Sequence, residues 1–330
     1  MSVPVLRRIL ELARARVPVC GSLPDKDASL ADNPEEFNTL REELKGLIME
    51  IPVDKALEKA GIEPDFVAPK DWAFVHRETD DEDIYWIRNF SGAPASSTVR
   101  VKAGQGQPRV MDPATGEVRW ISASKDSDGH RVFRLDMEEN DALFVVIGKD
   151  WEEEKPVLTR MEKEITEMTG PWELSFVSGL GAPEKTVFDR LISYTDSPDR
   201  NIRYYSGTVI YRKSFKLTRK QLRGSASFAI DLGSVKNLAR VYVNGQDIGV
   251  AWKAPFKLDI PEGCLHPGVN LLEVKVINLW PNRIIGDLQP DNDRTWTYIS
   301  SLFYTPESPL LPSGLLGPVR IKSVNTSINK

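Results

Sequence analysis

The side chains best suited to chemistry gather in one stretch, residues 278–287, which leaves an expected strand and enters a long loop. It contains Trp280, Asn282, Arg283 and Asp287. Sugar sites combine an aromatic ring, which covers the apolar C–H face, with amide, carboxylate and guanidinium groups that bond adjacent hydroxyls. The stretch has each of these types, so it is a candidate sugar-binding loop. The structural alternative is that Arg283 pairs with Asp287 and Trp280 packs against the body of the protein.

Four further residues could share the same face. Trp252 lies in a connection between two expected strands, Tyr205 precedes a Ser-Gly pair, and Arg294 is followed two residues later by Trp296. For each of them alone, packing is the simpler interpretation. Together they predict a sugar-facing patch at the loop end of a sandwich.

No catalytic pair can be assigned from the sequence. Inverting hydrolysis of a glycoside needs an acid and a base about 6.5–9.5 Å apart, and spacing along a chain does not give that distance. Glu173 and Asp287 lie near aromatic residues, whereas the run of glutamates at 152–154 favours a solvated stretch. The catalytic residues therefore stay unknown at this stage.

Metal and cofactor signals are weak. The three histidines, His76, His130 and His266, are scattered and show no metal spacing, and the two cysteines form no Cys-x-x-Cys motif. We expect no cofactor. Calcium bound by loop oxygens is compatible with a β-sandwich. Asp287, Asp291 and Asp293 would supply such oxygens, although a plain acidic loop is the simpler interpretation.

The amino-acid composition limits the classes of protein to which this chain can belong. The chain has 330 residues, 41% of them apolar, with 43 basic and 48 acidic residues well mixed. No basic field exists to hold a phosphate backbone, so we expect no nucleic-acid binding. No apolar run approaches the ~18 residues of a membrane helix, so we expect no membrane span. Arginines near the N-terminus interrupt any signal peptide, and the compartment stays unknown.

Residues 1–68 alternate between helical and extended patterns. Residues 3–16 and 54–60 and a segment from Asp32 to about residue 50 predict helices, with short strands at 17–21 and 51–53 between them. A parallel sheet of so few strands cannot cover its own faces. We therefore expect a partial α/β segment, half of a flavodoxin-like domain. Either the rest of that domain was lost, or another chain or self-association completes it.

Beyond this segment the pattern is mainly β. Short alternating runs in residues 69–150 predict a small antiparallel β-sandwich. The polar stretch 151–168 predicts a linker. Residues 169–330 contain the longest β region, in which a strand is expected over residues 204–215 and Asn244-Gly245 between two apolar runs predicts a tight hairpin. The expected fold class is two antiparallel β-sandwiches preceded by the partial α/β segment.

Several sequence segments resemble those of known glycoside hydrolase families. Residues 207–215 (GTVIYRKSF) and 231–249, which run into Asn-Gly, resemble the sugar-binding, galactose-binding-like jelly roll of family 2-type glycoside hydrolases. Residues 252–260 and 267–276 continue that pattern. Other segments are more specific and resemble the C-terminal region of multi-domain bacterial α-L-rhamnosidases. They are residues 278–287, 294–297, 308–320, 75–77, 83–89, 111–117, 29–32 and 64–66.

The resemblance covers nearly the whole chain and implies a glycosidase context. Members of that family carry a (β/α)₈ barrel whose carboxylates perform inverting hydrolysis, and no barrel pattern occurs in this sequence. The leading hypothesis is thus a carbohydrate-associated chain that binds or frames a rhamnose-containing or other glycan, with a catalytic-barrel chain as a further expected partner. The alternatives are a glycoside hydrolase using acids between the sandwiches, and a structural or assembly subunit without a ligand.

Overall fold

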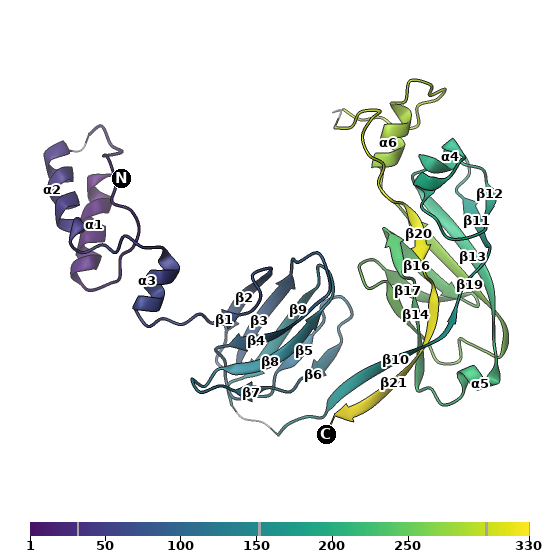
Figure 1. Ribbon diagram of the computed structural model, residues 1–330, viewed down its shortest axis with the longest axis horizontal. Coiled ribbons are helices and arrows are strands. Elements are labelled where there is room, and N and C mark those ends of the chain that lie inside the picture. Colours follow the sequence, from purple (N-terminus) through teal and green to yellow (C-terminus); the bar gives the residue numbers. More distant parts are fainter. Residues whose placement is uncertain (32, 151–152, 301–302, 330) are drawn as a thin grey trace. The chain divides into compact units, whose positions relative to one another are not determined.

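The computed structural model describes residues 1–31, 33–150, 153–300 and 303–329, and most of its regular structure is β (Figure 1). The chain divides into two compact units, Met1–Val67 and Ala68–Lys330. Among the described helices, none combines the length and the apolar composition that a bilayer span requires.

The first unit is built on three helices, α1 (Val3–Arg14), α2 (Pro34–Lys45) and α3 (Val53–Lys59). Helix α1 buries an apolar face against α2, as its periodicity predicted. The cap of α2 is Asn33, whose side chain accepts a hydrogen bond from the backbone of Glu35, while Asp32 lies outside the described residues.

The two short strands expected in this unit are reduced to one parallel bridge between Cys20 and Met49. Pro18 and Pro52 explain the difference, because proline has no backbone N–H to donate to a ladder. The segment expected as a strand at 51–53 instead leads into α3, with Pro52 as its cap residue. The α/β order is present, with shorter extended pieces than expected.

The second unit begins with a small antiparallel sandwich. Its two sheets have the strand orders β4-β8-β7 and β2-β3-β9-β5-β6. Their inner faces bury apolar side chains that include Tyr85, Ile87, Val99 and Val145. The strands are β2 (Trp72–Glu78), β3 (Glu82–Asn89), β4 (Ala95–Val101), β5 (Arg109–Met111), β6 (Val118–Trp120), β7 (Ser124–Lys125), β8 (Arg131–Met137) and β9 (Ala142–Gly148); the two-residue β1 (Phe66–Val67) ends the first unit.

A larger antiparallel sandwich follows, with one core between its two main sheets. The sheets have the orders β12-β11-β13-β19-β16-β17 and β10-β21-β14-β18, and β15 pairs with β20. The strands are β10 (Val157–Glu167), β11 (Trp172–Phe176), β12 (Lys185–Phe188), β13 (Thr208–Leu217), β14 (Ser227–Asp231), β15 (Ser234–Lys236), β16 (Leu238–Val243), β17 (Gln246–Ala251), β18 (Lys257–Ile260), β19 (Gly268–Ile277), β20 (Gly314–Gly317) and β21 (Arg320–Asn329).

The predicted hairpin at Asn244-Gly245 joins β16 to β17. Both residues have positive φ, 51° and 83°, as a type I′ turn requires, and Asn and Gly tolerate that conformation best. The turn matters for the site because β17 leads directly to Trp252.

Two sequence-based expectations about this unit are corrected. The stretch expected as a linker contains β10, which pairs with β21 over its whole length, whereas Trp151 and Glu152 lie outside the described residues. Several of its charged side chains have partners of opposite charge: Glu162, for example, bonds Lys257 and Lys322. The polarity that suggested a linker therefore belongs to a charge-paired strand.

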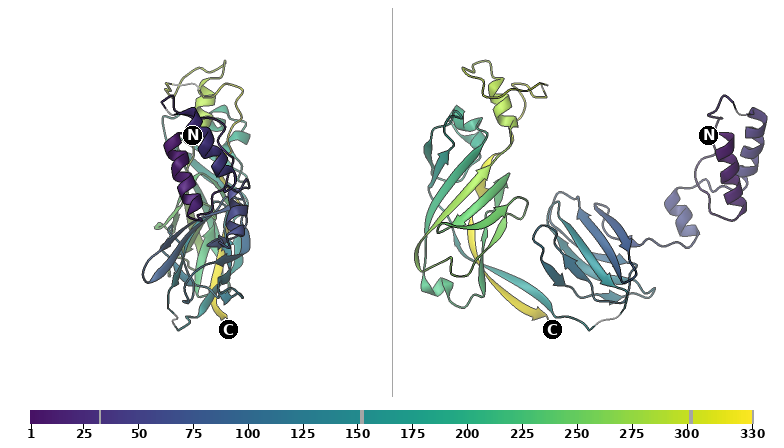
Figure 2. Two further views of the ribbon diagram at one scale, coloured as in Figure 1. Left: turned by 90° about the vertical axis from the view of Figure 1, so that its left-hand side faces the viewer. Right: turned by 180° about the vertical axis from the view of Figure 1, so that it is seen from behind.

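A strand expected to begin at Tyr204 begins only at Thr208. The preceding residues form the short helix α4 (Arg200–Arg203), capped by the side chain of Asp199. Other short helical pieces of this unit are η1 (Tyr194–Asp196), α5 (Arg219–Leu222) and α6 (Pro281–Asp287). Figures 1 and 2 show α6 and the loops after it at one end of the larger sandwich, beyond the tips of its strands.

Candidate carbohydrate-binding sites

Asn278 turns the chain out of the sheet into α6. It follows β19, is buried, and accepts a hydrogen bond from Gly207 N at 2.9 Å while donating to Tyr205 O at 2.8 Å. Pro281 then occupies the first turn of α6, where its missing N–H costs nothing. These two residues explain why a strand gives way to a helix within the candidate loop.

Trp280 stands at the start of α6 and is 66% exposed. The alternative in which it packs against the sandwich is therefore wrong. Leu279, directly before it, and Tyr298 and Phe303, in the loop after α6, are also large exposed side chains. Large exposed aromatic groups at the end of a sandwich are typical of surfaces that contact a ligand or another protein.

Asn282 and Tyr205 lie below that surface. The Asn282 amide donates to Leu311 O and Ser313 Oγ and accepts from Leu311 N at 2.8 Å, so its polar groups are used inside the protein. Tyr205 is fully buried and donates to Thr208 O at 3.0 Å. The expectation that these two residues face a sugar is corrected, because their side chains hold the loop in place.

Arg283 and Asp287 form the expected pair at the base of the loop, although loosely. Their closest charged atoms are 3.8 Å apart, and both side chains are more than nine-tenths buried. Asp287 Oδ2 accepts hydrogen bonds from Trp296 N and from the backbone and hydroxyl of Thr297, at 2.9, 2.7 and 2.7 Å. Burial lowers the pKa of Arg283, and the charge of Asp287 opposes that shift. The pair positions Trp296.

Two guanidinium groups lie near the ring of Trp296. The guanidinium of Arg294 lies 4.0 Å from its ring centroid and that of Arg283 lies 5.8 Å away. Its ring also contacts Gly181, where a Cβ would come within 3.0 Å of the indole. Arg294 is exposed, and Trp296 is partly exposed. The structure thus brings Arg283, Asp287, Arg294 and Trp296 together at the α6 end.

The three aspartates considered for calcium have other partners or lie apart. Asp287 is used by Trp296 and Thr297, and Asp291 forms an ion pair with Arg200 at 2.6 Å. In the described ranges, the carboxylates of Asp287, Asp291 and Asp293 are not gathered closely enough to hold a metal ion.

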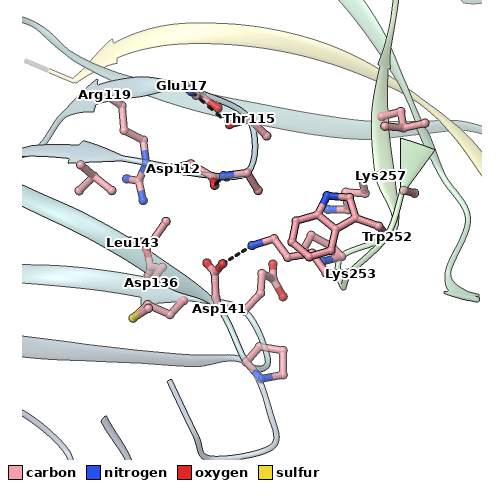
Figure 3. A pocket seen from close by; sticks show the side chains of 18 of the residues that line it. Asp112, Thr115, Glu117, Arg119, Asp136, Asp141, Leu143, Trp252, Lys253 and Lys257 are labelled. Carbon is pink, nitrogen blue, oxygen red and sulfur yellow. Dashed lines mark hydrogen bonds and ion pairs between the residues drawn. The ribbon is translucent and has the colours of Figure 1, made fainter. Parts of the chain in front are cut away.

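Trp252 occupies a different place, a groove of about 640 Å³ between the two sandwiches of the second unit (Figure 3). It follows β17, is 59% exposed, and forms one wall of the groove. Trp280 does not line this groove. The single aromatic patch expected from the sequence is therefore divided between two places.

The groove also gathers charged side chains that sequence reasoning did not single out. They come from turns and strand ends far apart in the chain, which is why no local pattern indicated them. The acidic and basic residues of the lining are Asp112, Glu117, Asp136, Glu138, Asp141, Arg119, Lys253 and Lys257. Figure 3 shows the bond between Lys253 and Asp141, which crosses from one sandwich to the other at 2.5 Å.

Comparison with known proteins gives the context of these sites. The sequence model of the alpha-L-rhamnosidase family matches residues 1–125. A solved rhamnosidase from Novosphingobium sp. PP1Y is similar over 99% of this chain, with 30% identity and a TM-score of 0.75, and this chain spans 32% of its length.

A curated relative is also named as a glycosidase. A protein of Formosa agariphila, provisionally named a β-glucuronidase, is 39% identical over 177 residues, which are 47% of this chain and 15% of that protein. Both relatives are glycosidases by name, and this chain spans well under half of either. The resemblance drawn from the motifs is confirmed: the chain is a mainly β, glycoside-hydrolase-related region, similar over nearly its whole length to part of a solved rhamnosidase.

Proposed function

We propose that this chain is a carbohydrate-associated region of an α-L-rhamnosidase-like glycoside hydrolase, and that its α6 end binds or frames a glycan. The observation that carries the proposal is the exposed Trp280 at the start of α6, in a chain similar to a rhamnosidase over 99% of its length. An exposed indole offers the apolar platform on which the C–H face of a sugar ring stacks.

Each residue of the α6 end has a distinct role in this proposal. Trp280 is the platform, and Arg294 supplies guanidinium donors for hydroxyl groups at the rim. Arg283 and Asp287 are positioning residues, since both are buried and Asp287 fixes the backbone that carries Trp296. A rhamnose unit suits an aromatic platform because its methyl group adds apolar surface.

Calorimetric titration of a rhamnose-containing oligosaccharide into the wild-type chain and the Trp280→Ala variant tests this proposal. We expect measurable binding by the wild type and a loss of roughly tenfold or more in the variant, the cost typical of a central aromatic contact. Leu158→Ala, which removes an exposed apolar side chain on β10, is the control. Equal affinity in wild type and Trp280→Ala would contradict the placement of the site.

A second candidate function is hydrolysis by the chain itself. The observation in its favour is the groove between the sandwiches, whose lining includes five carboxylates. Turnover of an aryl α-L-rhamnoside by the purified chain, abolished by an Asp or Glu substitution in that lining, would support it. We favour binding because one of those carboxylates, Asp141, is already engaged by Lys253.

Association with another chain is the third candidate, and it concerns the first unit. Leu30, Val53, Leu57 and Ile62 are exposed there, although the unit has its own small core. A catalytic-barrel chain or a second copy could cover these side chains. Sedimentation of the full chain distinguishes a self-associating protein from one that stays monomeric until a barrel-containing chain is added.

A further inference from the structure

We propose that the groove between the two sandwiches is a second, separate glycan site, which takes a neutral oligosaccharide with Trp252 as its stacking platform. The groove is independent of the α6 end, because Trp280, Arg294 and Trp296 do not belong to its lining. Binding in one place therefore does not require binding in the other.

The first support is the position of Trp252. More than half of its surface is exposed, yet it forms a wall of a concave region. Figure 3 shows its indole on one side of the groove, with Asp112, Thr115 and Arg119 on the other. A sugar ring placed between them would cover the indole with its C–H face and turn its hydroxyl groups toward the polar wall.

The second support is the balance of charge. The lining has five acidic residues and three basic ones. Two of the cations are already bonded to carboxylates, Lys253 to Asp141 at 2.5 Å and Lys257 to Glu162 at 3.1 Å, and Glu162 lies outside the lining. Of the other carboxylates, Asp136 bonds Ser96 and lies 3.4 Å from Arg134, which leaves Asp112, Glu117 and Glu138 facing the one remaining cation of the lining, Arg119. This acidic excess offers acceptors for hydroxyl donors and disfavours a uronate, sulfate or phosphate. The ligand that fits is thus hydroxyl-rich and uncharged.

The third support is the size of the groove. Ligand sites commonly measure about 300–1,000 Å³, and this groove, at about 640 Å³, lies within that range. Apolar side chains from both sandwiches, among them Val110, Leu143, Val250 and Leu258, line it beside the charged ones. A mixed lining of this kind suits sugars, which have apolar faces and polar edges.

Site-resolved oxidation of tryptophan tests the inference in the intact wild-type chain. N-bromosuccinimide oxidises exposed indoles, and peptide mass mapping gives the rate at Trp252 and Trp280 separately. The probes are a neutral rhamnose-containing oligosaccharide and a uronic-acid oligosaccharide of equal length. We expect the neutral probe to slow oxidation of Trp252 several-fold and the acidic probe to leave it unchanged.

The outcomes separate this inference from the proposed function. An unchanged oxidation rate at Trp252 overturns the groove site, whatever happens at Trp280. Protection of Trp280 alone keeps the α6 proposal and removes the groove. Equal protection of Trp252 by both probes contradicts the charge argument and with it the choice of a neutral ligand.

A matched pair of neighbouring residues gives an independent test. Glu138 lines the groove, whereas Glu139 is exposed and lies outside it. We expect Glu138→Gln to weaken binding of the neutral oligosaccharide about tenfold, the usual cost of losing a charged hydrogen-bond acceptor. Glu139→Gln should leave the affinity unchanged. Equal affinities in the two variants would argue against a carboxylate contact in the groove.

Discussion

Lys253 Nζ donates a hydrogen bond to Asp141 Oδ1 at 2.5 Å, and this ion pair ties the loop after β17 to the start of β9 in the smaller sandwich. The side chain of Asp141 is 11% exposed and that of Lys253 is 30% exposed. Because Trp252 is the neighbour of Lys253, the pair also fixes the residue that forms the wall of the groove.

Removing one partner of this pair should destabilise the second unit. Lys253→Met leaves the buried Asp141 carboxylate unpaired, and we expect a loss of about 1–2 kcal/mol, less than for a fully buried pair because Lys253 is partly exposed. Urea unfolding measures it. Adding Asp141→Asn should restore part of the loss, since no uncompensated charge then remains.

The control is the exposed pair between Arg240 and Asp247, whose side chains are 56% and 34% exposed. Arg240→Met should cost clearly less than Lys253→Met, because solvent screens an exposed pair. If the loss of stability in the double variant equals the sum of the losses in Lys253→Met and Asp141→Asn alone, the two residues do not act as a pair.

Substitution of Gly286 should displace α6. A Cβ on this residue would lie 2.6 Å from both Cβ and Cγ of Tyr204, so α6 or the segment around Tyr204 would have to move. We expect Gly286→Ala to lower the free energy of unfolding by about 1–3 kcal/mol, the cost of overpacking. Gly46→Ala is the control, because nothing lies within 4 Å of a Cβ there and its φ is ordinary. Equal stability of the two variants would mean that α6 does not pack on Tyr204 as described.

The ion pairs that Lys322 forms with Glu162 and Asp231 should make stability depend on pH in the acid range. Burial raises the pKa of Glu162 and of Asp231, but hydrogen bonds and charge from neighbouring lysines outweigh it and leave both pKa values lowered. A carboxyl whose pKa is lowered in the folded state stabilises the fold above its unfolded pKa, and that stability is lost as pH falls through the folded pKa. We therefore expect the melting temperature to fall below about pH 4.5.

Lys322 bonds both carboxylates, so it is the residue to change. Burial lowers the pKa of Lys322, but its bonds to Asp231 and Glu162 outweigh this and raise it, so its contribution is present at neutral pH and lost only in strong alkali. Lys322→Gln should flatten the acid dependence of the melting temperature, whereas Lys220→Gln on the exposed helix α5 should leave it as in the wild type. If the pH profile of the melting temperature is the same in Lys322→Gln as in the wild type, these ion pairs do not cause the acid dependence.

The strands were the most predictable part of the fold. Short alternating runs in residues 69–150 predicted an antiparallel sandwich, and strands such as Arg109–Met111, in which only the middle residue is buried, form it. The hairpin at Asn244-Gly245 followed from local conformational preference alone. In contrast, β10 carries charges on a face whose partners, such as Lys322, are about 160 residues away.

The candidate site was harder to predict for the same reason. Trp280, Arg283 and Asp287 are neighbours in sequence, and their proximity in space was foreseeable. The groove around Trp252 depends on Asp141 and other residues of a different sandwich, and only the tertiary fold brings them together. Local sequence also could not show that Asn282 points inward, because its partners Leu311 and Ser313 come from a distant loop.

Calorimetry on the wild-type chain tests the central claim of carbohydrate association most directly. The chain is titrated with a rhamnose-containing oligosaccharide and, in parallel, with a glucose oligosaccharide of equal length. We predict saturable heat for the first, with a Kd of about 1 mM or tighter, and a weaker response to the second. No saturable heat with either sugar, at concentrations well above that value, would contradict the account.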